Sequence, residues 1–314
     1  MRIPNVFAGP YLERAAHLRK DAASVASVLA DPATVLVPLW RGRSLVRRDR
    51  DARRAVLPPA TAALRGTLPE SELVMLGWFE GRACFAAELG GDSEPQLATE
   101  AEFADLRVVV GLLPQEEAGL LAYARAMVLW RARHRYCGTC GAPAVSASAG
   151  HVMKCSSAAC GAEQFPRLDP AIIVLVTDGE RALLGRQAAW PEGRYSTIAG
   201  FVEPGESLED AVLREVLEET GVRVTDAEYH SSQPWPFPSS LMIGFTARAA
   251  ADAVPRADEE LEDVRWFTRE QIASGTPGLP PPQSVSWRLI EDWYDADATL
   301  PLRQTPGVRR WQSR

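Results

Sequence analysis

Short hydrophobic runs separated by glycine turns dominate the first 90 residues of the chain. Each run is long enough for one strand, and the runs are joined in pairs by two or three residues that include glycine. This spacing predicts two β-hairpins. The paired runs are 34–40 with 44–48, around Arg41-Gly42-Arg43, and 72–80 with 82–89, around Glu80-Gly81.

Three further segments complete the pattern of this N-terminal part. Residues 49–69 are rich in Arg, Ala and Pro, which predicts a loop with at most a short helix. The apolar run 106–113 predicts another strand. Residues 116–133 begin with acidic side chains and end with arginines, as expected of an amphipathic helix that matches its macrodipole. Together these elements predict an α+β domain without a recognisable chemical motif.

The pattern changes after residue 165. Residues 171–178 (AIIVLVTD) form a nearly continuous apolar run, which is typical of a strand buried on both faces. A mixed sheet flanked by helices is therefore predicted for this part of the chain. Its other strands are predicted at 181–186, 195–201, 222–231, 241–249 and 264–268.

One helix is predicted between these strands, within the segment 200–222 (GFVEPGESLEDAVLREVLEETGV). Ser207 is a suitable N-cap and Gly221 a suitable C-terminal stop. Apolar residues recur between them at helical spacing and predict a buried stripe. They are Leu208, Ala211, Val212, Val216 and Leu217.

Composition and charge limit the class of protein. The chain has 314 residues, 46% hydrophobic and 24% charged, which is ordinary for a globular protein of two domains with a small module between them. Neither a signal peptide nor an apolar run of about 20 residues is apparent, so we expect a cytoplasmic protein. The net charge of −7 gives no overall attraction to nucleic acid. A phosphate-bearing substrate would need metal ions or particular arginines.

Carboxylates gather on the predicted helix. Glu215 and Glu219 are four residues apart and share a face, with Glu218 beside them, while Glu206 precedes the helix and can fold back toward it. Arg214 and Glu218 are also four apart and can pair. Clustered carboxylates repel one another unless cations neutralise them, and such oxygen ligands suit Mg²⁺ or Mn²⁺. The alternative is an ordinary solvated acidic face.

Four of the five cysteines cluster, at Cys137, Cys140, Cys155 and Cys160. Four thiolates in this arrangement match a structural zinc ribbon, although the second pair is separated by four residues instead of two. A redox C-x-x-C pair is the competing interpretation. The fifth, Cys84, alternates with apolar neighbours and is predicted to be a buried core thiol. His151 and Lys154 are a weak indication that the ribbon binds nucleic acid.

Residues 232–242 (SQPWPFPSSLM) carry three prolines around two aromatic residues. The prolines stiffen the backbone and hold Trp235 and Phe237 at defined angles. Taken alone, such a segment is at least as typical of a rigid surface loop, or of a Pro-rich ligand for another protein's domain, as of a substrate-binding site.

The segment 200–222 resembles the Nudix box at every defined position: Gly, five residues, Glu, seven residues, then Arg-Glu-aliphatic-any-Glu-Glu-any-Gly-aliphatic. SQPWPFPSSLM resembles the motif of the NADH pyrophosphatase branch of Nudix hydrolases, which also carries a four-cysteine zinc ribbon before the Nudix domain. The resemblance implies a Nudix α/β/α sandwich of α+β class, preceded by a zinc ribbon and an N-terminal α+β domain. The expected boundaries are 1–133 for the accessory domain, 134–166 for the ribbon, 167–300 for the Nudix domain and 301–314 for a tail.

The resemblance also implies site residues. Glu215 and Glu219 are expected to bind catalytic Mg²⁺ or Mn²⁺, with Ala199 through its carbonyl, Glu260 from the acidic run 258–263, and Glu218 in the same cluster. Glu219 is the candidate for activating water, and Glu259 or Glu262 replaces Glu260 if the register differs. Aromatic stacking on a base is expected from Phe165 and Phe201, for which core packing is the alternative. The remaining substrate contacts are expected from Gln233, Pro234, Trp235, Pro236, Phe237, Pro238, Ser239, Ser240 and Ser286.

The implied reaction is metal-dependent hydrolysis of the pyrophosphate of NADH or NAD⁺ to nicotinamide mononucleotide and AMP, together with removal of the NAD cap from RNA. The branch also implies one structural zinc per chain and a homodimer. Two alternatives remain: a Nudix hydrolase of another nucleoside diphosphate derivative such as ADP-ribose, and a non-catalytic zinc-ribbon module that senses a nucleotide. The intact glutamates count against the non-catalytic alternative.

Overall fold

The computed structural model describes residues 4–61, 68 and 72–311, which form two compact units. One unit contains residues 7–168 together with 235–239, and the other contains 4–6, 169–234 and 240–311. We call them the N-terminal unit and the C-terminal unit. Among the described residues, no helix is both long enough and apolar enough to cross a membrane.

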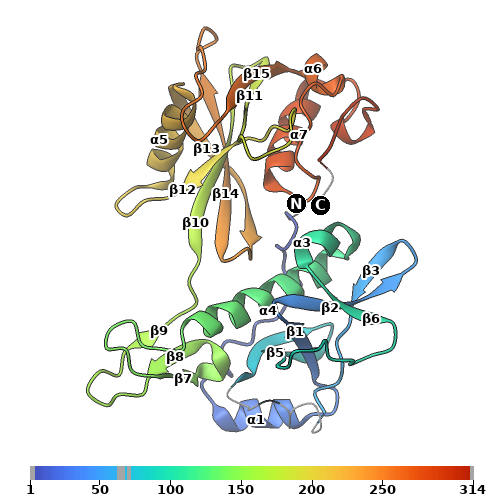
Figure 1. The fold of residues 1–314 in the computed structure, drawn as a ribbon, viewed down its shortest axis with the longest axis vertical. Helices are drawn as coiled ribbons and strands as arrows, with labels where there is room; N and C mark the ends of the chain where they lie inside the picture. The colour runs from blue at the N-terminus through green and yellow to red at the C-terminus, as the bar shows by residue number, and fades with distance from the viewer. Residues whose placement is uncertain (1–3, 62–67, 69–71, 312–314) are drawn as a thin grey trace. The chain divides into compact units, whose positions relative to one another are not determined.

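The N-terminal unit is built on a sheet of strand order β3-β2-β1-β5-β4, with β6 paired to β2 (Figure 1). The predicted hairpins are confirmed as β1–β2 and β4–β5, and β1 and β5 run parallel in the centre. The main elements are α1 (Ala22–Ala30), β1 (Val35–Trp40), β2 (Arg43–Asp49), β3 (Ala52–Ala55), β4 (Val74–Phe79), β5 (Arg82–Glu88), β6 (Ala101–Ala104), α3 (Leu106–Val109), η2 (Val110–Leu112) and α4 (Gln115–Arg133). Cys84 is buried in β5, as predicted, and burial raises the pKa of its thiol to about 11.

Two predictions for this unit are wrong. The apolar run 106–113 is helical, as α3 and η2, because the Asp105 side chain accepts a hydrogen bond from the Arg107 amide (2.8 Å) and starts a helix there. The expected loop 49–69 contains strand β3, which pairs with β2; residues 62–67 and 69 of that prediction lie outside the described part of the chain.

The predicted helix 116–133 is confirmed as α4, but its polar residues do not all face solvent. Glu117 is buried, and its carboxylate accepts hydrogen bonds from the Arg54 side chain (2.6 Å) and the Ala55 amide (2.5 Å). An acidic residue expected to favour the helix start therefore also binds the helix to strand β3.

The C-terminal unit is a sheet between two helical layers, with strand order β13-β14-β10-β11-β15 and β12 paired to β10. Strand β10 runs parallel to β14. The elements are β10 (Asp169–Thr177), β11 (Arg181–Arg186), β12 (Ile198–Phe201), α5 (Leu208–Thr220), β13 (Val224–Trp235), β14 (Ser240–Ala249), β15 (Asp263–Thr268), α6 (Arg269–Ala273), α7 (Val285–Asp297) and η4 (Leu302–Gln304). Each predicted strand is present, but β13 continues four residues beyond the predicted end at Ser231 into the proline–aromatic segment.

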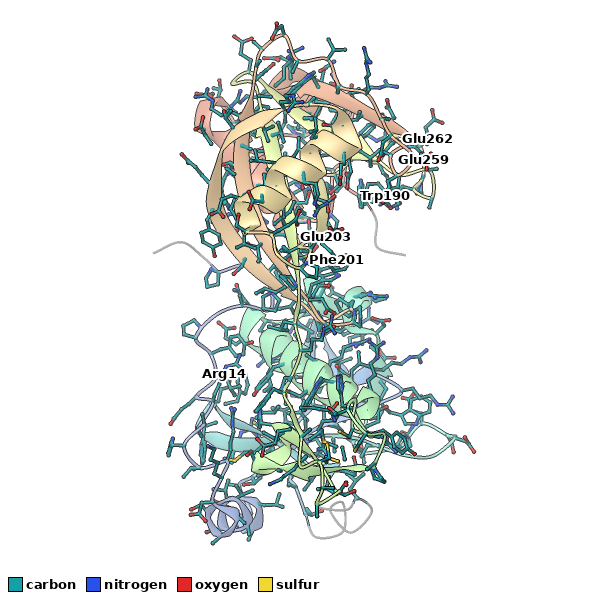
Figure 2. The ribbon with its side chains drawn as sticks, turned by 90° about the vertical axis from the view of Figure 1, so that its left-hand side faces the viewer. Arg14, Trp190, Phe201, Glu203, Glu259 and Glu262 are labelled. Carbon is teal, nitrogen blue, oxygen red and sulfur yellow. The ribbon has the colours of Figure 1, made fainter. Side chains whose placement is uncertain are left out.

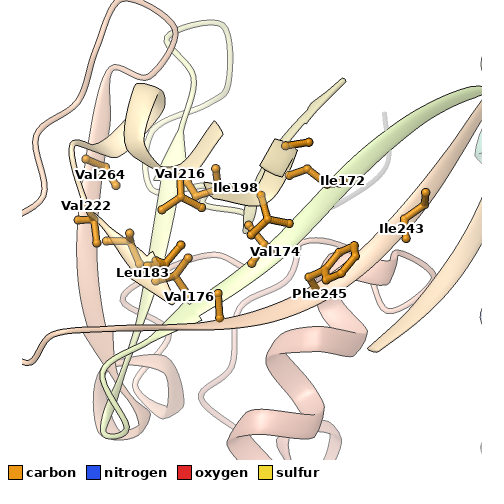
Figure 3. Close-up of a cluster of buried hydrophobic side chains, with 14 of the residues drawn as sticks. Ile172, Val174, Val176, Leu183, Ile198, Val216, Val222, Ile243, Phe245 and Val264 are labelled. Atoms are coloured by element: carbon orange, nitrogen blue, oxygen red, sulfur yellow. The ribbon is translucent and has the colours of Figure 1, made fainter. Parts of the chain in front are cut away.

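The central strand β10 is buried on both faces, as its apolar run predicts. Ile172, Val174 and Val176 point to the side of α5 (Figure 3), while Ile173 and Leu175 pack with α7 on the opposite side. Alternating side chains of one strand thus build two separate cores, which is why the run shows no polar alternation.

Candidate active site

Helix α5 carries the predicted carboxylates and is defined by local interactions at both ends. Ser207 and Asp210 form a capping box, and Gly221 ends the helix in the left-handed conformation (φ 68°). Ala211, Val212 and Val216 are buried against the sheet, as predicted. The prediction of burial is wrong for Leu217, which is 37% exposed. Glu215, on the same helix, lies against Gly200 in β12, so the carboxylates flank the apolar stripe at the end of that strand.

Gly200 has a packing role that explains why the motif contains glycine there. A Cβ atom at this position would lie 1.9 Å from the Cδ and Oε1 atoms of Glu215. The Glu215 carboxylate therefore occupies the space that any larger residue would fill. The residue before Gly200, Ala199, pairs with Ile173 in β10, so Glu215 lies next to the Ala199 position.

Arg214 joins three of the glutamates to the end of β12. Its guanidinium donates to Glu206 (2.9 Å) and Glu218 (3.0 Å), and it forms an ion pair with Glu215 (2.9 Å). It also donates to the carbonyl oxygen of Phe201 (3.0 Å). Hydrogen bonding to Arg214 lowers the pKa of Glu206 to about 2. The predicted pairing of Arg214 with Glu218 is confirmed, and Arg214 orients the three carboxylates of Glu206, Glu215 and Glu218.

Glu219 is the most buried carboxylate of the cluster, at 6% exposure. Among the described residues, no hydrogen bond or ion pair to its side chain is found. Burial, followed by repulsion from Glu215, Glu260 and Asp258, raises its pKa to about 8. A buried carboxylate in an excess of negative charge is the environment that a bound cation would relieve, so these residues fit a divalent metal ion.

The acidic run 258–263 lies close enough for its charges to act on the carboxylates of α5. Glu260 is exposed, and its charge contributes to raising the pKa of both Glu215 and Glu219. Glu262 instead pairs with Arg186, while Glu259 is exposed (Figure 2). Glu262 already has a cationic partner, and the charge that acts on Glu215 and Glu219 is that of Glu260, so Glu260 remains the better candidate for the metal.

The four cysteines form the second candidate metal centre, in the ribbon of β7 (Ala144–Ala147), η3 (Ser148–Gly150), β8 (Val152–Cys155) and β9 (Glu163–Gln164). Their sulfurs all lie within 4.8 Å of one another, with 3.8 Å between Cys137 and Cys160 and 3.5 Å between Cys140 and Cys155. Tetrahedral zinc with Zn–S bonds of about 2.3 Å would separate the sulfurs by about 3.8 Å. The set therefore fits zinc. In the described part of the chain, no carboxylate or histidine group is equally compact.

The longer spacing of the second cysteine pair has a simple structural explanation. The Cys137 amide donates to Ala142, five residues on, whereas the Cys155 amide donates to Ala162, seven residues on. The two turns are otherwise alike, so the second one loops out two additional residues. His151 is buried and its Nε2 bonds to the Met75 carbonyl (2.8 Å), which makes it a structural residue of the N-terminal unit and not a contact for nucleic acid.

The predicted stacking residues Phe165 and Phe201 are exposed by 62% and 60%. Core packing, the alternative considered for both, is therefore excluded. Phe201 lies on the surface at the end of β12, close to Glu203 (Figure 2). Both rings are free to meet a planar ligand.

Two predicted substrate contacts use their polar atoms inside the protein. The Gln233 side chain is 1% exposed; its amide donates to Val6 (3.2 Å) and Gln283 (2.7 Å), and its Oε1 accepts from Val285 (2.9 Å). Ser286 is 3% exposed, and its hydroxyl bonds to Ser196 (2.9 Å) and Thr197 (2.9 Å). Neither side chain is available to bind a nucleotide in this conformation.

The other loop residues differ in burial. Pro236, Phe237 and Ser240 are buried, Pro234, Trp235 and Ser239 are partly buried, and Pro238 is exposed after a cis peptide bond.

Three family models match consecutive parts of the chain. Residues 33–130 match the "NADH pyrophosphatase-like rudimentary NUDIX domain", 132–165 the "NADH pyrophosphatase zinc ribbon domain" and 167–287 the "NUDIX domain". A protein of Stutzerimonas stutzeri named "NAD-capped RNA hydrolase NudC" is 41% identical over 252 residues, covering 80% of this chain and 88% of the relative. The chain belongs to the Nudix hydrolases.

Two further relatives of this Nudix hydrolase differ in how much of their length is matched. A Mycobacterium bovis protein, also named "NAD-capped RNA hydrolase NudC", is 38% identical over 277 residues, covering 81% of this chain and 87% of its own. Human "NAD-capped RNA hydrolase NUDT12" is 41% identical over 203 residues, 60% of this chain and 44% of its own. Membership makes the protein a hydrolase of pyrophosphate bonds with a zinc ribbon and a divalent metal site.

Sequence reasoning about this Nudix hydrolase missed the packing of Glu215 against Gly200 and the link from Arg214 to the Phe201 carbonyl. The glycine itself was the available signal, because a glycine within a strand often marks the close approach of another group. The hydrogen bond from Arg214 to the Phe201 carbonyl could not be predicted, because the pattern of side chains does not show which backbone groups they reach.

Proposed function

We propose that this Nudix hydrolase cleaves the pyrophosphate of NADH and NAD⁺ into nicotinamide mononucleotide and AMP, and that it removes the NAD cap from the 5′ end of RNA. The buried, unpaired Glu219 within the carboxylate cluster carries the chemical part of the proposal. The substrate class rests on the matched relatives, which are named NAD-capped RNA hydrolases.

The proposed reaction adds water across one phosphoanhydride bond. The water oxygen bonds to one phosphorus, the bridging oxygen leaves with the other phosphate, and two monophosphates result. A bound Mg²⁺ or Mn²⁺ would neutralise the phosphate oxygens and make the bound water more acidic. Glu215, Glu219, Glu218, Glu260 and the Ala199 carbonyl would hold the metal.

Two residues have more specific proposed roles. Glu219 accepts the proton of the attacking water, since its carboxylate lies buried in the cluster and has no hydrogen-bond or ion-pair partner among the described residues. Arg214 holds Glu215 in place without itself touching the substrate, because its donors are used within the protein.

For the nucleotide, we propose stacking by the exposed rings of Phe165 and Phe201. Residues 234–240 would shape the pocket through their backbone and the partly buried Trp235. Gln233 and Ser286 would support this pocket from behind instead of touching the ligand.

We also propose one zinc per chain in the ribbon, a homodimer, and a cytoplasmic location. The four-cysteine cluster supports this location, because such metal-binding clusters are typical of compartments where cellular reductants keep thiols reduced. The domain boundaries that we propose are 133/134, 166/167 and 300/301.

The deciding experiment incubates the protein separately with NADH, NAD⁺ and ADP-ribose in Mg²⁺ or Mn²⁺ and resolves the products. AMP formed from NADH with the highest kcat/KM supports the proposal, whereas turnover of ADP-ribose alone refutes it. A transcript with a 5′ NAD cap tests decapping, which should leave a 5′-monophosphate.

Glu219→Gln should lower kcat by about 10²- to 10⁴-fold, because it removes the proton acceptor and a metal ligand. Glu209→Gln, an exposed position in the first turn of the same helix, is the matched control. Near-normal kcat in Glu219→Gln would exclude the role proposed for this residue.

A further inference from the structure

Each compact unit contains a short segment that is separated in sequence from the rest of that unit. Residues 235–239, at the tip of the proline–aromatic loop, belong to the N-terminal unit, although the residues on either side belong to the C-terminal unit. Conversely, residues 4–6 belong to the C-terminal unit, where the Asn5 amide donates to Ser231 (3.0 Å) and to the Ser232 carbonyl (2.9 Å). The tip of this loop is thus grouped with residues 7–168 within one unit.

Phe237 is the anchor of the loop tip in the N-terminal unit. Its side chain is 8% exposed, and its ring contacts the rings of Phe7 (6.1 Å between centroids) and Trp235 (5.2 Å) edge-on. The guanidinium carbons of Arg107 and Arg125 lie 4.5 Å and 5.1 Å from its ring centroid, within the range of cation–π attraction.

Arg125 has an unusual environment that points to the same contact. Its Nε and Nη1 atoms are buried without a hydrogen-bond partner among the described residues. Burying a cation without full hydrogen bonding costs free energy, and burial lowers the pKa of this guanidinium. The charges of Asp105 and Glu88 oppose that effect, and the Phe237 ring supplies a further attraction. The Arg125 guanidinium thus lies where it can stabilise the position of the Phe237 ring.

We propose that Arg107 and Arg125 are positioning residues for substrate binding, which hold Phe237 and thereby the backbone of residues 234–240. This inference rests on the proposed function, in which that loop shapes the nucleotide pocket. The two arginines supply no reacting group in the proposed chemistry and would affect the affinity for the dinucleotide.

The test combines one readout that needs no substrate with one that does. Hydrogen–deuterium exchange of the peptide covering 233–240 is compared in wild type, Arg107→Gln, Arg125→Gln and the control Arg133→Gln, an exposed position at the end of helix α4. Steady-state kinetics with NADH follow on the same proteins. Both Gln variants at the loop should exchange faster in this peptide and show KM raised by about threefold to thirtyfold with kcat within about twofold of wild type. Two further variants, Arg107→Lys and Arg125→Lys, should recover part of the affinity for NADH, because Lys keeps a cation over the Phe237 ring.

Three outcomes overturn the inference. Unchanged exchange in both Gln variants would show that the arginines do not hold the loop, whatever the substrate is. Faster exchange with unchanged KM would show that the loop is held but does not position substrate. If kcat falls and KM rises by similar factors in the Lys and Gln variants, and the unfolding midpoint is lowered, the arginines have a purely structural role. If wild type does not hydrolyse NADH, the proposed function fails separately, and the KM of the dinucleotide that it does hydrolyse takes its place.

Discussion

The substitution Gly200→Ala should separate activity from stability in this protein. The added Cβ would lie 1.9 Å from the Glu215 carboxyl carbon, so that group must retreat by about 1 Å or more to reach a tolerable contact. The atom in conflict is the far end of a flexible side chain, and Gly200 is not among the residues with positive φ. We therefore expect a loss of less than about 1 kcal/mol in the free energy of unfolding, below the usual range for overpacking.

The effect on activity should be much larger, because a catalytic ligand displaced by about 1 Å can cost about 100-fold in rate. The assay is kcat for NADH hydrolysis across a Mg²⁺ or Mn²⁺ titration, with unfolding followed in urea. Gly90→Ala is the matched control, since its Cβ would meet nothing within 4 Å and its φ needs no glycine. A Gly200→Ala protein with kcat within about threefold of wild type would refute the argument that the Glu215 position seen against β12 is the working one.

Three further outcomes follow from the structure. Cys155→Ser should remove the bound zinc measured by mass spectrometry and lower the unfolding midpoint, whereas Cys84→Ala should keep its zinc; equal zinc in both would contradict the ribbon site. Gln233→Leu should lower the free energy of unfolding by about 1–3 kcal/mol, because it leaves buried backbone groups without partners, and unchanged urea unfolding would disprove this. Burial lowers the pKa of His151 to about 4, so its neutral form stabilises the fold above about pH 6.5 and that contribution is lost as the pH falls toward 4. His151→Gln should therefore flatten the pH dependence of unfolding in this window relative to the exposed control His17→Gln, and identical profiles would argue against it.

Local spacing predicted the parts of the site that depend on neighbours in sequence. The helix caps at Ser207 and Gly221 and the pairing of Arg214 with Glu218 all lie within one helix, where a difference of four residues defines a contact. The exception in the N-terminal unit is α3, where one hydrogen bond to Asp105 outweighed an apolar run that resembled a strand.

The sequence by itself determined the chemistry of this protein: the carboxylates of α5, the four thiols of the ribbon, and the residues that cap and turn the chain around them. Only the tertiary structure decided which of the predicted contacts face a ligand. Gln233 bonds to Val6, 227 positions away, and Phe237 lies near Arg107 and Arg125, so both are turned inward. Such partners are distant in sequence, and no period or spacing encodes them. They are selected by the packing of the whole chain, because a buried polar or aromatic group must find its partner wherever the fold brings one within reach.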